Sequence, residues 1–144
     1  MGKISEFFKG FLTPPKTAMD ALQANPLFKE LESVHDAMSK MCEDGIDADE
    51  FPSGVGQFGL VPTNPIPCRT VFGSTKYLAH LRWGDGSKVL YEREGSTISA
   101  VSPKPIDTYK ISHADGRAPV TLFISPYQKR ISEKAPEGFT LLKD

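Results

Sequence analysis

The sequence is poor in the residues that most often carry chemistry or cross-links. It contains two cysteines, three histidines and one tryptophan among 144 residues. One possible bridge between Cys42 and Cys68 is not the framework of a disulfide-stapled secreted protein, so both thiols are expected to be reduced. The histidines and cysteines nowhere stand at the spacing of a zinc site, and the acidic run over 43–50 lacks the alternating ligands of a calcium loop. No metal and no cofactor is predicted.

The chain also lacks an excess of charge and a long apolar run. Its formal net charge is −1, which makes no case for bulk attraction to nucleic acid or to a membrane surface. No window approaches the ~18 consecutive apolar residues of a membrane span. The first residues interleave charged and apolar side chains, unlike a signal peptide. We therefore expect a cytoplasmic protein, with segment 3–12 as its only candidate for membrane contact.

That first segment is amphipathic. Apolar residues recur at i, i+3, i+4, i+7 and i+8 between Ile4 and Leu12, which predicts a helix over residues 3–12. Its phenylalanine stripe, with Lys3 and Lys9 on the other side, suits a partner's groove or a membrane surface. Packing on its own domain is the favoured interpretation. Partner docking comes next, because so few basic residues attract anionic lipid weakly.

Two further helices are predicted before the pattern changes. A short helix covers about 16–23, and Asn25 followed by Pro26 supplies an N-cap and a first-position proline for the main helix. Gly45 is expected to cap that helix at its C-terminal end. Beyond it the composition turns to glycine, proline and acidic residues, which is typical of an irregular connection.

The second half of the chain changes to a period of two, which is typical of strands. Strands are predicted over 77–83, 88–94, 106–112, 120–125 and 139–142. Helices first and strands second indicate an α+β fold, with the N-terminal helices packed on one face of an antiparallel four- to five-stranded sheet. We expect a single domain over 1–144. It consists of a helical layer (1–45), an irregular connection (46–67) and an antiparallel sheet (68–144).

Two Asp-Gly pairs mark hairpin turns, because Asp-Gly accepts the positive φ angles that tight turns require. If Asp85 and Asp115 each head such a turn, Leu81 faces Leu90, and Tyr109 faces Leu122. The register then predicts a core of Tyr77, Ala79, Leu81, Trp83, Leu90, Tyr109, Ile111, Val120, Leu122 and Ile124.

The opposite face of the predicted sheet carries the candidate ligand-binding residues His80, Arg82, Tyr91, Arg93 and Lys110. Basic groups between aromatic rings can hold a phosphate or stack a single-stranded base. A solvated sheet face has the same composition. The solvated face is favoured, because the chain lacks the overall basic character of a nucleic-acid binder.

A nucleophilic site would require Cys68 to lie near a base. The thiol precedes Arg69, and a neighbouring cation can lower a thiol pKa. His80 and His113 are the candidate bases, but only the fold could bring them to the thiol. No catalytic residue is predicted, and the set of Cys68, His80 and His113 remains an alternative.

Short motifs also follow one another in a specific order over residues 59 to 140. They are Asn64-Pro65-Ile66-Pro67, Tyr77-Leu78, Leu81-Arg82, Arg93-Glu94-Gly95-Ser96, Ile106-Asp107-Thr108-Tyr109, Asp115-Gly116, Ser125-Pro126-Tyr127 and Ala135-Pro136-Glu137-Gly138-Phe139. Together they resemble a group of small bacterial proteins of unknown function. The resemblance implies a soluble bacterial protein and transfers no catalytic residue. The related proteins carry a small residue where Cys68 stands, which argues against a shared catalytic thiol.

These observations favour a non-catalytic protein–protein interaction module, which acts through an exposed sheet face or an apolar helix surface. An enzyme is the less favoured class. The alternatives are a small enzyme that depends on cysteine and histidine, and anion or nucleic-acid binding on a basic sheet face. The partner and the oligomeric state stay open at this point.

Overall fold

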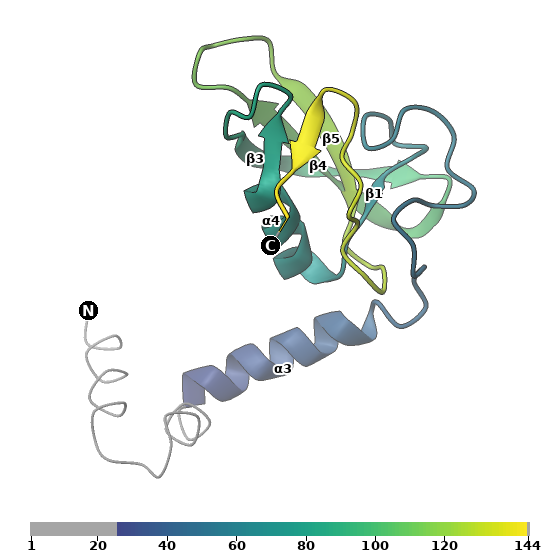
Figure 1. Ribbon diagram of the computed structural model, residues 1–144. Helices are drawn as coiled ribbons and strands as arrows, with labels where there is room; N and C mark the ends of the chain where they lie inside the picture. Colours follow the sequence, from purple (N-terminus) through teal and green to yellow (C-terminus); the bar gives the residue numbers. More distant parts are fainter. Residues whose placement is uncertain (1–25, 144) are drawn as a thin grey trace, which may run out of the picture. The chain divides into compact units, whose positions relative to one another are not determined.

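The computed structural model describes residues 26–143, with only the backbone of Phe28 (Figure 1). The predicted helices over 3–12 and 16–23 lie outside the described residues. The chain divides into two compact units, Met1–Met38 and Ser39–Asp144. Each is described by itself, and the single domain over 1–144 stays a prediction.

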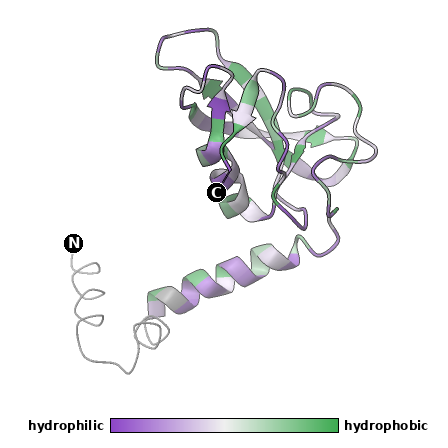
Figure 2. Cartoon of the chain, in the orientation of Figure 1, coloured by the Kyte–Doolittle hydropathy of each residue, from purple (hydrophilic) through white to green (hydrophobic). Residues whose placement is uncertain are grey.

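Helix α3 (Pro26–Lys40) contains the boundary between the two units. It begins at Pro26, as expected, because the first helical position needs no backbone donor. Hydrophobic and hydrophilic residues alternate along it in short bands (Figure 2), the pattern of an amphipathic helix. The helix ends at Lys40 and is followed by tight turns, in one of which the Gly45 N–H donates to the Cys42 carbonyl oxygen at 3.0 Å.

The second unit is built on a four-stranded sheet in the order β1-β5-β4-β3. These strands are β1 (Ile66–Pro67), β3 (Leu90–Ser99), β4 (Ser102–Ser112) and β5 (Val120–Ser125). The pairs β3–β4 and β4–β5 are antiparallel, whereas β1 runs parallel to β5 with Ile66 opposite Ile124. The α+β class is confirmed, but the prediction of an antiparallel sheet is wrong. The parallel strand has two residues, too few to show a period.

The hairpin of β4 and β5 confirms the register predicted from the Asp115-Gly116 turn. Tyr109 lies opposite Leu122, as expected. Both are buried, as are Ile111 and Ile124. The connection between the last pair, Ile111 and Val120, covers residues 112–119 and is longer than a tight turn, but the Asp-Gly pair lies at its centre and gives the correct register.

The predicted first hairpin is wrong except at the Asp85-Gly86 turn, where Arg82 and Lys88 form a single antiparallel bridge. Helix α4 (Thr70–His80) occupies part of the expected strand over 77–83. The remainder, β2 (Leu81–Trp83), pairs with β6 (Phe139–Leu141), so that Leu81 lies opposite Leu141 rather than Leu90. Leu90 and Ala79, both predicted in the core, are exposed. A short apolar run fits either period, and here Tyr77 and Leu78 are buried on a helical face.

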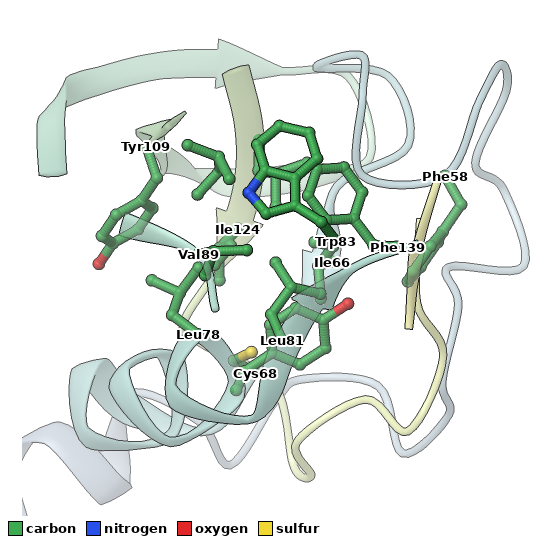
Figure 3. Close-up of a cluster of buried hydrophobic side chains, with 13 residues drawn as sticks. Phe58, Ile66, Cys68, Leu78, Leu81, Trp83, Val89, Tyr109, Ile124 and Phe139 are labelled. Carbon is green, nitrogen blue, oxygen red and sulfur yellow. The ribbon is translucent and has the colours of Figure 1, made fainter. Parts of the chain in front are cut away.

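The core of the second unit brings α4 and both sheets together (Figure 3). Tyr77 and Leu78 of α4 join buried side chains of the four-stranded sheet. Trp83 of β2 and Phe139 of β6 complete the core, with ring centroids 4.7 Å apart. Among the described residues, the helical side chains of this core come from α4.

Candidate functional site

The strand register separates the residues of the predicted basic face. Tyr91 and Arg93 lie opposite Ile111 and Tyr109 of β4, whose buried side chains face the core. Residues opposite each other share a face, and successive residues alternate, so Lys110 lies on the other face of the sheet. The premise of one shared basic face is therefore wrong for these strands.

His80 and Arg82 lie outside the four-stranded sheet. His80 ends α4, and its Nδ1 donates to the carbonyl oxygen of Lys76 at 2.8 Å, since that oxygen can only accept. Arg82 stands in β2, and its Nη1 donates to the carbonyl oxygens of Ala79 at 2.9 Å and Leu81 at 2.8 Å. The Arg82 guanidinium thus satisfies local backbone acceptors.

Arg93 is paired with a carboxylate on its own sheet. Its Nη2 donates to Asp107 Oδ1 at 2.9 Å and its Nε to the same atom at 3.3 Å. The hydrogen bond with Asp107, reinforced by charge attraction, raises the pKa of Arg93. The positive charge is thus compensated, and the geometry offers little support for the anion-binding alternative.

Cys68 lies inside the core, beside α4 (Figure 3). It is fully buried, and burial raises the pKa of its thiol to about 12, against the weaker opposing effect of hydrogen bonds from Ser132 and Ser74. A buried neutral thiol is a poor nucleophile. The structure gives Cys68, His80 and His113 three different sets of partners, so the catalytic alternative has no assembled site.

We expect Cys68 in the native protein to react very slowly with iodoacetamide, because the thiolate is the reactive form and burial disfavours it. Mass spectrometry of the alkylated protein, before and after unfolding in urea, measures the difference. Cys42, which is also fully buried, is the internal reference. Native labelling of Cys68 as fast as that of the unfolded chain would revive the catalytic alternative.

The two Asp-Gly turns meet through one arginine. Arg117 Nη2 donates to Asp85 Oδ2 at 3.1 Å and to Asp115 Oδ2 at 2.8 Å. Its guanidinium lies over the Trp83 ring, 5.2 Å from the centroid. Asp115 N–H also donates to His113 Nδ1 at 2.9 Å. We call Trp83, Asp85, His113, Asp115 and Arg117 the turn clasp.

In the turn clasp, one guanidinium is paired with two carboxylates. Hydrogen bonds from Arg117 hold the pKa of Asp115 down to about 2. Hydrogen bonds from Ser87, and then from Arg117, lower the pKa of Asp85. Both carboxylates therefore stay ionised and paired at neutral pH. The arrangement joins two loops.

A groove runs beside the C-terminal half of α4. Its cavity volume is about 640 Å³, within the range of roughly 300–1,000 Å³ that is usual for ligand sites. It is lined by Asp49, Lys76, Tyr77, His80, Ile131, Ser132, Glu133, Leu141, Leu142 and Lys143. We call it the α4 groove.

Hydrogen bonds fix the walls of the α4 groove. The Leu142 N–H donates to the His80 carbonyl oxygen at 2.9 Å, which ties the chain after β6 to the end of α4. Elsewhere in the lining, Ser132 Oγ donates to the Asp49 carbonyl oxygen at 2.6 Å. The Tyr77 hydroxyl donates to a further carbonyl oxygen, also at 2.6 Å. The two hydroxyl groups of the lining thus donate to backbone.

Of the residues that sequence reasoning selected for function, only His80 lines the α4 groove. The groove joins α4 to segments far along the chain, over 131–133 and 141–143. No periodicity or turn signal predicts that such segments meet. The only hint in the sequence is the motif over 135–139, which lies between the two.

Within residues 26–143, no three histidine, cysteine, aspartate or glutamate side chains gather where they could hold a metal ion. None of the described helices combines the length and the apolar character needed to cross a membrane. In comparisons with known proteins, no family model matches the chain, and no curated protein and no solved structure matches it either.

Proposed function

We propose that this chain is a non-catalytic protein-recognition module of the bacterial cytoplasm, and that the α4 groove binds a short segment of a partner polypeptide. The composition of the groove lining carries the proposal. Apolar side chains from Tyr77, Ile131, Leu141 and Leu142 stand beside charged residues of both signs. This mixture complements a peptide, which offers apolar side chains and both charges on one extended chain.

Charge favours a polypeptide over a polyanion. Lys76 and Lys143 offer positive charge, but Asp49 and Glu133 line the same groove. A nucleic acid backbone would bring phosphates close to these carboxylates, and like charges in a binding site are unfavourable. A peptide can place acidic and basic side chains to suit both pairs.

The chemistry of the lining supports binding rather than catalysis. The hydroxyls of Ser132 and Tyr77 both donate to backbone carbonyl oxygens, so neither is activated by a base. Neither cysteine forms a disulfide, and both are buried, which accords with a reducing compartment.

Peptide selection tests the proposal. A random peptide library displayed on phage should yield ligands for the full chain, with affinities measurable by fluorescence polarisation. Leu142 is 51% exposed in the groove, so a bound peptide would bury its side chain. We expect Leu142→Asp to weaken binding about tenfold or more, since losing one buried leucine contact costs roughly 1.5–3 kcal/mol.

Val55→Asp is the matched control. Val55 is also an exposed aliphatic residue, 71% accessible, and it lies outside the groove lining. Its replacement should leave peptide affinity unchanged. The proposal fails if no peptide is selected, or if the selected peptides bind the Leu142→Asp variant as tightly as the natural protein.

A further inference from the structure

Strand β3 is long for a strand with one unpaired edge. It spans ten residues, Leu90–Ser99, against roughly five or six in an average strand. Strand β4 pairs with one side, and within the described part of the chain no strand pairs with the other. Natural edges are usually kept short or covered, because a row of unpaired backbone groups recruits another strand. The unpaired edge of β3 is therefore a candidate site for pairing with another strand.

A bulge divides β3 into two halves. Arg93 lies opposite Tyr109, but Gly95 lies opposite Thr108, so Glu94 is an extra residue in the strand. The bulge shifts the alternation of faces by one position. A second irregularity sets Ile98 against three residues of β4, 103–105, so the extra residues there belong to β4 and the alternation along β3 continues to Ile98. The residues opposite the core-facing positions of β4 are Tyr91, Arg93 and Ser96, whereas Glu92, Gly95 and Thr97 lie on the other face.

We propose that β3 pairs with β3 of a second copy of this chain, antiparallel from Tyr91 to Ile98, about a two-fold axis. Ser99, at the end of the strand, is 5% exposed, and its Oγ donates to the Pro62 carbonyl oxygen of its own chain at 2.6 Å. In this register the first residue of one paired segment faces the last residue of the other. Arg93 then faces the partner's Ser96, and Glu92 faces the partner's Thr97. Because of the bulge, each of these pairs lies on one face of the joined sheet, as pairing across an antiparallel ladder requires.

Charge and the faces of the side chains together select this register. Glu92, Arg93 and Glu94 form the charged centre of β3. In this register, each of them faces an uncharged residue of the second copy. A shift of one residue in one direction would set Glu94 against the partner's Glu94, which is unfavourable because like charges directly opposite repel. A shift of one residue in the other direction would set Arg93 against the partner's Thr97, which lies on the opposite face of the sheet. Gly95, at the dyad, has open space where a side chain would stand.

Two of the three exposed apolar side chains of β3, Tyr91 and Ile98 but not Leu90, find partners in the same register. Ile98 is 84% exposed and Tyr91 is 42% exposed in the single chain. In this register, Tyr91 faces the partner's Ile98 at both ends of the joined strands. An aromatic ring opposite a β-branched side chain is a favourable cross-strand pair. A second copy of the chain thus complements this edge in backbone, charge and apolar side chains.

Light scattering coupled to size-exclusion chromatography tests the dimer, given a chain mass of 15.8 kDa. We expect a weight-average mass of at least about one and a half times that value at roughly 100 µM, because a dimer with a Kd of about that size would be half formed there. Ile98→Arg should raise the Kd about tenfold or more, and Val55→Arg, at another exposed aliphatic residue, should leave it unchanged. A monomeric natural protein overturns the proposal, as does an Ile98→Arg variant that dimerises normally.

Disulfide trapping tests the register itself. Tyr91 and the partner's Ile98 would be directly opposite, with Cβ atoms about 4.5–5.5 Å apart. The double variant Tyr91→Cys/Ile98→Cys should therefore cross-link under mild oxidation into a covalent dimer, visible on a non-reducing gel. Ile98→Cys alone should not, because the two copies of residue 98 lie at opposite ends of the joined strands. Equal cross-linking of both variants would overturn the proposed register.

Discussion

Gly45→Ala is expected to lower the free energy of unfolding of the second unit by about 3 kcal/mol or more. A Cβ atom at Gly45 would lie 2.3 Å from the carbonyl oxygen of Tyr127 and 2.5 Å from the Cα of Gln128. Both are backbone atoms, so no rotamer change relieves the clash, and two segments of main chain must separate. Urea unfolding followed by tryptophan fluorescence measures the loss.

Gly116 separates this effect from the cost of an unusual backbone conformation. It has a φ of +81° in its hairpin turn, and a Cβ there would meet nothing within 4 Å. Gly116→Asn should therefore be nearly neutral, because asparagine tolerates this conformation. Gly45→Asn should be as damaging as Gly45→Ala. Near-natural stability of Gly45→Ala would show that the chain around Tyr127 can move aside.

Asn64→Asp is expected to destabilise the second unit by about 3–5 kcal/mol at neutral pH, as for an uncompensated buried charge. Asn64 is 1% exposed, and its Nδ2 donates to Glu50 Oε1 at 3.0 Å and to the Gly56 carbonyl oxygen at 2.9 Å. The introduced carboxylate could donate neither of these hydrogen bonds. It would instead face two oxygen acceptors, and the one on Glu50 is charged. In the natural protein, the hydrogen bond from Asn64, followed by that from Lys134, lowers the pKa of Glu50.

The loss in Asn64→Asp should depend on pH in a defined direction. Burial and Glu50 raise the folded-state pKa of the introduced carboxyl above its unfolded value of about 3.9. The variant is therefore least destabilised below about pH 4, and the loss grows as pH rises through the raised pKa. Urea unfolding at several pH values, with the natural protein as reference, measures this slope.

Glu50→Gln supplies the control. Combined with Asn64→Asp, it removes the repelling charge and leaves an amide that can donate to the introduced carboxylate. The double variant should recover part of the stability, because residues in direct contact are energetically coupled. A loss that is the same at every pH would contradict the role of charge and would leave only the missing hydrogen bonds.

The sequence correctly predicts those parts of the fold that depend on residues close to one another in the chain. The Asp115-Gly116 turn gives the correct pairing of Tyr109 with Leu122, and Pro26 marks the start of α3. The α+β class follows from the change of period along the chain. In each case the decisive contacts join residues close in sequence or recur over a whole segment.

Helix α4 shows why the rest could not be predicted. Tyr77, Ala79 and Leu81 alternate as in a strand, but Leu81 pairs with Leu141, far along the chain. That partner lies beyond the reach of any turn signal. The α4 groove depends on the same distant pairing, so the sequence does not predict the groove either.

Gly45 is important for a different reason from the one that the sequence suggests. It was expected to cap the main helix, but that helix ends at Lys40. Its importance comes instead from the closeness of the chain at Tyr127 and Gln128. Tertiary contact requires a glycine there, and a single sequence does not reveal such contacts.

The turn clasp and the β2–β6 pair together confine the middle of the second unit. Strands β2 and β6 close a ring of chain that contains β3, β4 and β5. Within that ring, Arg117 and Asp85, 32 residues apart, close a smaller loop around β3 and β4. Both closures hold the edge of β3 in place. A strand that binds to this edge does not have to order it, because the edge loses its conformational entropy on folding and not on association.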